Sequence, residues 1–252
     1  MLASLERGIE VLEYLSMKKS AAVSEIAAVF SVDKSTASRI LSTLAHHNLV
    51  AKNEENGRYS LSVGALLFSY RATENHKIIR AARPVMQRVT EKTGESSHLC
   101  ALFKKNIYII DMIKSHKNKY RKDTTFPGMA EPLHCSAVGK CMLAFLPQEE
   151  AKDILQGKEM IAFTKKTVRS EEELISQFQS IRSSGYALDN EEFETGVFCM
   201  AVPIFNGSGS SVFSIGLSGG QDIMNLGVFN RNLTVLKDAS EEITARYNSI
   251  KD

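Results

Sequence analysis

Apolar positions in the first 50 residues recur at helical spacing in three short stretches. The first stripe predicts a helix that closes a three-helix core, and the other two predict a pair of short helices joined by a tight turn within residues 23–48. The first stripe consists of Leu5, Ile9, Leu12 and Leu15. The paired stripes consist of Ile26, Ala27 and Phe30, and of Ala37, Ile40, Leu41 and Leu44.

Polar residues provide start signals for the paired helices. Ser24 with Glu25 begins the first of them, and Asp33 begins the second, because such side chains accept hydrogen bonds from the free N–H groups of a first turn. Ser31 and Val32 leave room for only a few turn residues between the helices. This spacing is typical of a helix-turn-helix.

The second of these helices has a polar outward face without acidic residues. Hydroxyls can bond to phosphate or to base edges, and arginine can bind guanine with two hydrogen bonds. The first two turns of such a helix enter the major groove. We therefore expect DNA contacts from Lys34, Ser35, Thr36, Ser38, Arg39 and Ser42. The same composition also fits a solvated surface helix, so the choice depends on the residues that follow.

Two short strands are predicted directly after the helices, over 49–52 and 58–61. The pair Asn56-Gly57 between them is a strong hairpin signal, which favours the winged type of helix-turn-helix. Its two glutamates argue against DNA contact at the tip of the wing. The strands are expected to bring three side chains to the phosphate backbone: Lys52, Arg58 and Tyr59.

Beyond the wing, the pattern predicts a connecting helix over 63–73 and a domain boundary near Asn75. Mixed helices and strands then predict an α+β domain. The expected organisation is a winged helix-turn-helix over 1–62, a linker helix over 63–75 and the larger domain over 76–252. Its helices are expected over 77–92, 137–146, 148–156, 171–183 and 223–247. Its strands are expected over 97–103, 107–113, at Tyr186, and over 198–205 and 212–217.

Composition narrows the class of protein without defining its function. Of the 252 residues, 43% are hydrophobic and 24% are charged, which is ordinary for a soluble globular protein. A net charge of +2 means that any DNA contact must come from a local arrangement of charge. One such arrangement is a predicted loop with five cationic residues: Lys114, Lys117, Lys119, Arg121 and Lys122. This loop could attract an anionic ligand or DNA, or it could simply be solvated.

The cysteines and the apolar runs bear on location. Four cysteines without CxxC spacing, and the lack of an apolar N-terminal segment, favour reduced thiols in the cytoplasm. No apolar run is long enough to span a membrane. We therefore expect a cytoplasmic protein that does not contact a membrane.

Two stretches of the larger domain are distinctive: PLHCSAVGK over 132–140 and GYALDNEEFETGVFCMAVPIF over 185–205. With KSTASRILSTL, GRYSL and the closing SIGLSGG, they make the chain resemble the IclR-type (isocitrate lyase regulator) transcription regulators. In that family a winged helix-turn-helix precedes an effector-binding domain similar to the GAF fold. The resemblance covers nearly the whole chain.

The resemblance implies an effector pocket bounded by the helix that starts within PLHCSAVGK and by strands around Cys199 and Ser218. Its implied lining is Ser136, Ala137, Val138, Gly139, Asp189, Val197, Cys199 and Ser218. Physical reasoning agrees in part, because the N–H groups of a helix N-terminus favour a carboxylate. A thiol in a strand, such as that of Cys199, is also an ordinary core residue.

The function implied by the resemblance is a sequence-specific DNA-binding transcription regulator, a repressor of a catabolic operon. A small carboxylate, either a keto acid or a sugar acid, would modulate its binding to operator DNA. One winged helix reads few bases, so a dimer on a palindromic operator is expected. Family members are similar in forming dimers that pair into tetramers. A scaffold protein would instead leave Lys34 and Arg39 dispensable for DNA binding.

The sequence also contains residues that could form a catalytic site or a metal site. The alternative is a thiol-dependent small-molecule enzyme on a GAF-like domain with an accessory DNA-binding module, using His134 with Cys135, or Cys199 with a distant histidine. Neighbours in an extended segment point in opposite directions, so His134 and Cys135 do not readily pair. The chain is therefore not expected to be an enzyme, and no cofactor is expected. Four acidic residues lie close together on a predicted turn and could bind a metal: Asp189, Glu191, Glu192 and Glu194. Consecutive acidic residues on a turn are mostly solvated.

Overall fold

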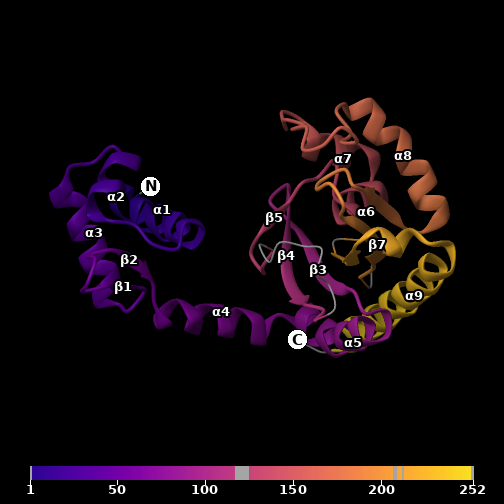
Figure 1. The fold of residues 1–252 in the computed structure, drawn as a ribbon, viewed down its shortest axis with the longest axis horizontal. Helices are drawn as coiled ribbons and strands as arrows, with labels where there is room; N and C mark the ends of the chain where they lie inside the picture. Colours follow the sequence, from indigo (N-terminus) through magenta and orange to yellow (C-terminus); the bar gives the residue numbers. More distant parts are fainter. Residues whose placement is uncertain (1, 117–124, 207–208, 212, 251–252) are drawn as a thin grey trace. The chain divides into compact units, whose positions relative to one another are not determined.

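The computed structural model describes residues 2–116, 125–206, 209–211 and 213–250. The chain divides into two compact units, Met1–Asn75 and His76–Asp252, and Figure 1 labels their elements. Each unit has its own apolar core. The cationic residues Lys117, Lys119, Arg121 and Lys122 lie outside the described residues.

The N-terminal unit is a winged helix-turn-helix, as predicted. Strand β1 pairs antiparallel with β2, and Val50 lies opposite Leu61. Gly57 has a positive φ of 68° at the Asn-Gly turn, where glycine is unstrained. The elements are α1 (Ala3–Lys18), α2 (Val23–Val29), α3 (Lys34–His46), β1 (Val50–Lys52), β2 (Tyr59–Leu61) and α4 (Val63–Asn75).

The start of α1 differs from the prediction. Val11 and Leu15 are buried, whereas Leu5 and Ile9 are 61% and 49% exposed. The expected four-residue stripe is therefore wrong in its first half, because only the later turns of α1 contribute to the core. In α2 the cap also differs: the N-cap residue is Ala22, and the Glu25 carboxylate accepts its N–H at 2.9 Å, so Ser24 is not the cap.

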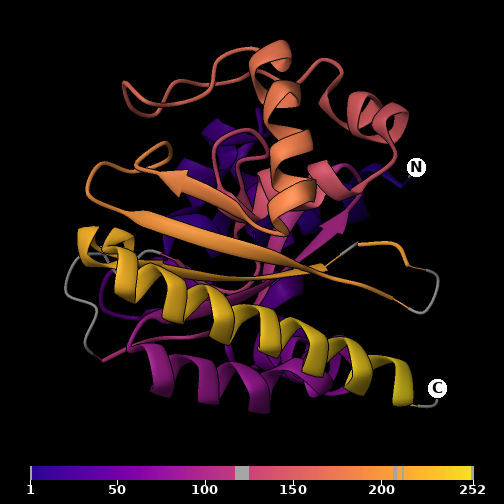
Figure 2. The same cartoon turned by 90° about the vertical axis from the view of Figure 1, so that its right-hand side faces the viewer.

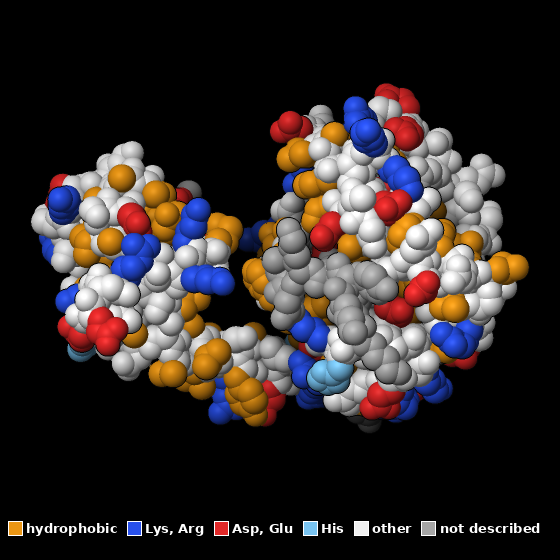
Figure 3. Space-filling model, in the orientation of Figure 1, with side chains coloured by type: hydrophobic (Ala, Val, Ile, Leu, Met, Phe, Trp, Pro, Cys, Tyr) orange, Lys and Arg blue, Asp and Glu red, His pale blue; other side chains and the backbone are white. Residues whose placement is uncertain are grey.

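Helix α4 exposes its apolar side chains. Within the described N-terminal unit none of its residues is buried, and orange side chains follow it in Figure 3. The exposed group consists of Val63, Leu66, Leu67, Phe68 and Tyr70, each more than half exposed. Nothing inside the unit therefore uses the apolar surface of this helix.

The C-terminal unit is built on a six-stranded antiparallel sheet in the order β5-β4-β3-β8-β7-β6. The predicted strands are present with shifted starts, since the strand expected at Tyr186 begins at Ala187 and Val212 lies outside the described residues. The two-residue strand β5 is an addition that was too short to predict. The strands are β3 (Ser96–Phe103), β4 (Asn106–Ile113), β5 (Ala130–Glu131), β6 (Ala187–Asn190), β7 (Phe198–Ile204) and β8 (Phe213–Gly219). All seven residues of β7 are buried, as a strand covered on both faces requires.

Helices cover both faces of this sheet, with one apolar cluster on each side. In Figure 2, α5 (Lys77–Thr93) and the yellow α9 (Leu226–Ser249) lie side by side under one face. The other face carries α6 (Ala137–Phe145), α7 (Gln148–Leu155) and α8 (Glu171–Ser184). This arrangement confirms the α+β class and is consistent with a GAF-like domain. None of the described helices is both long and apolar enough to cross a membrane.

Candidate functional site

The first turn of α3 is held by Asp33. Its Oδ1 accepts the Thr36 N–H at 2.9 Å, its Oδ2 accepts the Thr36 hydroxyl at 2.7 Å, and the Ser35 hydroxyl also donates to it. These donors lower the pKa of Asp33 well below its ordinary value. The Ser35 and Thr36 protons therefore point at the cap, which leaves these hydroxyls as acceptors for an external donor.

The rest of the predicted DNA-contact set on α3 faces solvent. Ala37, Leu41 and Leu44 are buried on the opposite side of the helix, as the stripe predicted. The exposed polar residues are Lys34, Ser35, Ser38, Arg39 and Ser42, whereas Thr36 is half-buried. This face offers two cations and three hydroxyls without an acidic neighbour on α3, which suits contact with phosphates and base edges.

The wing departs from its expected role at two residues. The Arg58 guanidinium donates to the Glu25 carboxylate at 2.8 and 3.2 Å and to Ser20 Oγ and O at 3.1 and 3.0 Å. Tyr59 is only 9% exposed and belongs to the core. Arg58 thus ties the wing to α2 and Tyr59 packs into the core, so neither side chain is free on the wing surface. Contact of these residues with phosphate stays a prediction. Lys52 is exposed, with Glu54 at 3.7 Å.

A small cavity of about 10 Å³ lies in the C-terminal unit where α6 begins. It has room for about one water molecule. Six residues of the implied pocket line it: Ser136, Ala137, Val138, Asp189, Val197 and Cys199. Four further residues line it that the sequence did not indicate: His98, Glu131, Phe193 and Glu194. Gly139 and Ser218 belong to the implied pocket but do not line the cavity.

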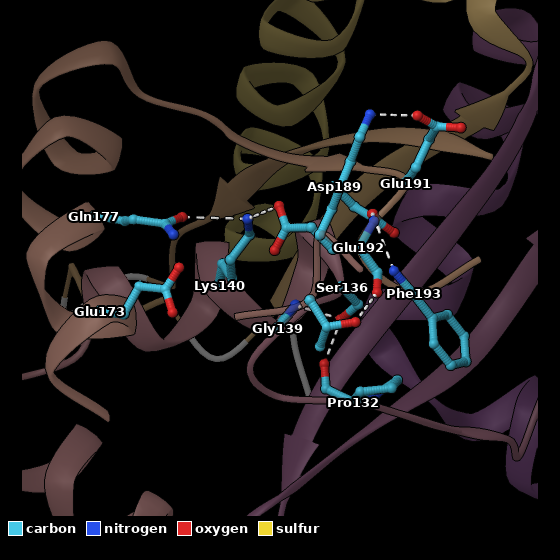
Figure 4. A network of polar contacts seen from close by, with 12 residues as sticks. Pro132, Ser136, Gly139, Lys140, Glu173, Gln177, Asp189, Glu191, Glu192 and Phe193 are labelled. Atoms are coloured by element: carbon cyan, nitrogen blue, oxygen red, sulfur yellow. Dashed lines mark hydrogen bonds and ion pairs between the residues drawn. The ribbon is translucent and has the colours of Figure 1, made fainter. Parts of the chain in front are cut away.

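Ser136 and Gly139 shape the start of α6. Ser136 Oγ accepts the Gly139 N–H at 3.0 Å and donates to the Pro132 carbonyl at 2.6 Å, as Figure 4 shows. A Cβ on Gly139 would lie 2.5 Å from Pro132 O and 2.6 Å from Leu133 O. The glycine therefore allows the preceding backbone to close against the first turn, and both residues build the helix start.

Asp189 is a buried carboxyl in the cavity wall, only 1% exposed. Its Oδ1 accepts the N–H groups of Glu192 at 2.7 Å and Phe193 at 3.3 Å. The pKa of Asp189 is raised to about 7, because burial, together with the nearby Glu192 carboxylate, outweighs the lowering by these hydrogen bonds and by Lys140. Asp189 is therefore poised to change charge near neutral pH.

Beside Asp189, Lys140 of α6 and Glu192 form an ion pair whose side chains are 3% and 10% exposed. Lys140 Nζ also donates to Gln177 Oε1 of α8 at 3.2 Å, and Figure 4 shows both contacts. The sequence placed Lys140 in a motif but did not predict this pair. Glu192 is thus paired with this buried cation, whereas the Lys140 charge acts on Asp189 by lowering its pKa.

The acidic residues of the cluster lie in different surroundings. Glu191 pairs with Lys166 at the surface, Glu192 pairs with Lys140, and Glu194 lines the cavity. Among the residues that the structure describes, no group of three or more His, Cys, Asp or Glu side chains could hold a metal ion.

Cys135 is a poor candidate for a nucleophile. Cys135 is fully buried, and burial together with the Asp189 and Glu192 charges raises its thiol pKa far above the ordinary value. His134 Nε2 lies 3.0 Å from the Ile161 carbonyl. Since the thiolate is the reactive form, this environment suppresses the chemistry that the enzyme alternative needs.

His98 and Glu131 reach the cavity through pairing of distant strands. His98 lies opposite Gly216 in the β3–β8 pairing, and a Cβ on Gly216 would come within 3.2 Å of the His98 ring. Glu131 lies in β5, one residue before Pro132. A lone histidine in an apolar strand and a glutamate next to PLHCSAVGK were the available signals.

Comparison with known proteins agrees with this architecture. Residues 4–54 match the IclR helix-turn-helix domain, and residues 70–245 match the C-terminal domain of bacterial IclR transcriptional regulators. The regulator KdgR of Dickeya chrysanthemi is 33% identical over 217 residues, covering 86% of this chain and 70% of that protein. These relatives are transcription regulators, so the comparisons give the enzyme alternative no support.

Two solved structures are similar over nearly the whole chain. The Thermotoga maritima IclR structure is 27% identical with a TM-score of 0.80, covering 98% of this chain and 100% of that chain. An IclR homolog from Microbacterium hydrocarbonoxydans, complexed with 4-hydroxybenzoate, is 19% identical with a TM-score of 0.85 over 98% of this chain and 100% of that one. With both family domains matched in order along the sequence, the chain belongs to the IclR family of bacterial transcription regulators.

Proposed function

We propose that this regulator represses an operon of catabolic genes and that a small carboxylate bound at the start of α6 modulates its hold on operator DNA. The observation that carries the effector proposal is the cavity at the N-terminus of α6, lined by Ala137, Val138 and Asp189. Helix N-termini attract anions through their free N–H groups and the helix dipole.

The other wall residues favour a carboxylate that also carries hydroxyl or keto groups. Glu131, Asp189 and Glu194 line the same cavity and can accept hydrogen bonds from hydroxyls, whereas they would repel a second carboxylate. A sugar acid fits this combination through its hydroxyls, and the keto oxygen of a keto acid can accept a hydrogen bond from Asp189 in its protonated form, because the pKa of Asp189 is raised to about 7. In support, a structural relative is described in complex with 4-hydroxybenzoate, which is also a carboxylate.

DNA recognition is proposed to use the exposed face of α3, with Lys34, Ser38, Arg39 and Ser42 as contacts and Lys52 at the wing. Ser35 and Thr36 take part through their acceptor lone pairs. We propose a dimer on a palindromic operator, with two dimers pairing into a tetramer in the manner of the family, because one recognition helix reads too few bases to select a genomic site. Affinity for the operator is then expected to fall steeply with salt.

The test is a thermal-shift panel of glyoxylate, pyruvate, gluconate, galacturonate and benzoate on the full chain. A ligand at ~100 times its Kd is expected to add about 2.7 kcal/mol to the free energy of unfolding. The shift should be lost in Asp189→Asn and weakened in Cys199→Ser. A compound that binds is then added to the protein held on its own upstream DNA, which a repressor should release.

Two results would contradict the proposal. If no acid in the panel shifts the midpoint, or if the shift persists unchanged in both variants, the cavity is not a carboxylate site. If the compound instead tightens DNA binding, the protein does not act as a repressor relieved by that ligand.

A further inference from the structure

The effector cavity is closed by one loop. Its space of about 10 Å³ admits little more than a water molecule. The walls from α6, β6 and β7 belong to packed elements. Phe193 and Glu194 come from residues 191–196, the irregular connection between β6 and β7. The other two lining residues, His98 and Glu131, lie in β3 and β5. This loop is therefore the irregular part of the wall, and we expect it to move when a ligand larger than water enters.

The loop bends sharply at both ends. Glu191 has a φ of 60° and Gly196 a φ of 81°. Side-chain-bearing residues rarely adopt the left-handed region, so Glu191 is held there by its surroundings. Thr195 and Gly196 are exposed, whereas Glu192 is buried. The loop thus has an outer edge in solvent and an inner edge fixed within the domain.

Several contacts fasten the outer part of the loop to residues 163–167. Lys166 pairs with the Glu191 carboxylate, and the Phe163 and Phe193 rings meet edge to face with centroids 4.9 Å apart. The hydroxyls of Thr164 and Thr167 donate to the carbonyls of Glu191 and Glu192 at 2.7 and 2.6 Å. The Lys166 side chain is 52% exposed, so water screens its ion pair.

The inner part is fastened by Lys140 alone among the described cations. Its ammonium pairs with Glu192 Oε1 inside the domain, and Glu192 Oε2 is buried without a hydrogen-bond partner among the described residues. If the pair separated in place, two unpaired charges would remain buried, which is strongly unfavourable. Glu192 can leave Lys140 only when the loop carries it into water.

We propose that Lys140 is a positioning residue of the effector site, because its buried ion pair with Glu192 latches the loop of residues 191–196 over the cavity. Separation of this pair opens the loop and admits the ligand. Lys140 does not line the cavity, so it acts through the loop that carries Phe193 and Glu194. Through Gln177 the same ammonium contacts α8, which links loop closure to a second helix.

The role in effector entry rests on the proposed function, but closure of the loop does not. The experiment therefore reads closure without any effector. The full-length protein is treated with iodoacetamide, and alkylation of Cys199 in the cavity wall and of Cys141 in the core is followed by peptide mass spectrometry. Cys199 reports opening of the loop, whereas Cys141, fully buried on α6, reports global unfolding.

We expect Lys140→Met to speed alkylation of Cys199 at least tenfold and to leave Cys141 at its wild-type rate, because the uncompensated Glu192 draws the loop into water. Glu192→Gln is the milder variant, since its amide oxygen can still accept from Lys140, and a smaller rise is expected. The amides of Glu192 and Phe193, which donate to Asp189, should exchange with deuterium faster in both variants.

Lys166→Met is the matched control. It also removes a lysine that pairs with a glutamate of this loop, but its ion pair with Glu191 is at the surface. Cys199 is expected to react within twofold of wild type. The proposal is overturned if Lys140→Met and Glu192→Gln leave the Cys199 rate unchanged, if Cys141 accelerates in parallel, or if Lys166→Met has the same effect as Lys140→Met. If the latch is confirmed but no carboxylate binds, the proposed effector class fails and the latch remains.

Discussion

Helices α3 and α6 begin with the same kind of N-cap, but most of α3 is exposed or half-buried, whereas almost all of α6 is buried. In each, an N-cap side chain accepts the N–H of the third helical residue: Asp33 accepts from Thr36, and Ser136 accepts from Gly139. Three of the thirteen residues of α3 are buried, against eight of the nine in α6. The same kind of N-cap therefore starts a helix with a solvent-exposed face in the N-terminal unit and a buried helix in the C-terminal unit.

This difference changes what a charge can do. Lys34 and Arg39 on α3 are exposed, so their charges can neutralise phosphates without a partner in the protein. Lys140 on α6 is only 2% exposed, so its charge needs Glu192 beside it. A binding surface for a large ligand such as DNA can therefore be recognised from the exposed residues of one helix. A buried site can be recognised only when the residues that pair with its charged groups are also known.

The largest expected effect comes from Gly139, the third residue of α6. Gly139→Ala would place a Cβ 2.5 Å from the Pro132 carbonyl oxygen, and backbone atoms cannot move aside easily. We expect a loss of about 3 kcal/mol or more in the stability of the C-terminal unit. Hydrogen exchange resolved by peptide measures this unit separately.

Thr36→Ala is the counterpart on α3. It removes one hydroxyl bond to Asp33 from a half-buried position and adds no atom. A change below about 1 kcal/mol is expected in the N-terminal unit. Equal losses in the two variants would contradict the contrast between an open and an enclosed helix start.

Arg39→Ala tests the open face. If Arg39 holds a base edge, DNA affinity should fall by about 1 to 3 kcal/mol and base preference should relax at one position. Selection of binding sites from random DNA, followed by anisotropy on the selected site, measures both. Arg58→Ala is the control, because its guanidinium is bound by Glu25 and Ser20: its base preference should stay unchanged while the unit loses stability.

Asp189→Asn tests the enclosed site through pH. The pKa of Asp189 is raised from 3.8 to about 7, so between these values the folded state holds a proton that the unfolded chain releases. Stability therefore falls as the pH rises through this window. The asparagine oxygen can accept the same N–H bonds without charge, so at pH 8 we expect the variant to gain about 1 to 2 kcal/mol.

Chemical denaturation at a series of pH values between 4 and 8 measures this difference, which should shrink toward pH 4. Other charged and titratable groups face the same region: Glu192 and Lys140 beside Asp189, and His98, Glu131 and Glu194 in the cavity. A gain that is constant across the pH range would show that folding does not raise the pKa of Asp189.

The smallest effect is expected at the cap of α3. The pKa of Asp33 is lowered from 3.8 because hydroxyls and an N–H donate to its carboxylate. Its contribution to stability is thus complete above the ordinary pKa and is lost as the pH falls below it. Asp33→Ala should increase exchange of the first-turn amides of α3 at pH 7 and remove the extra fraying of wild type at pH 3. Unchanged exchange at pH 7 would contradict the capping role.

Prediction from sequence succeeded where the signals are local. The Asn56-Gly57 turn, the Asp33 cap and the buried face of Ala37, Leu41 and Leu44 each depend on neighbours within a few residues. It failed where a segment far away in the sequence supplies the partner of a side chain. Arg58 is captured by Ser20 and Glu25, more than thirty residues earlier in the chain, and nothing near Arg58 in the sequence indicates that partner.

By itself the sequence determined the two-part architecture, the recognition helix and the motif at the start of α6, because periodicity, caps and turn residues act over short distances. Only the tertiary structure decided that His98 and Glu131 face Asp189, that the cavity is nearly closed and that Lys140 is paired with Glu192, 52 residues away. A buried charge needs a partner, but the sequence alone does not say which one, because strand pairing and helix packing choose it.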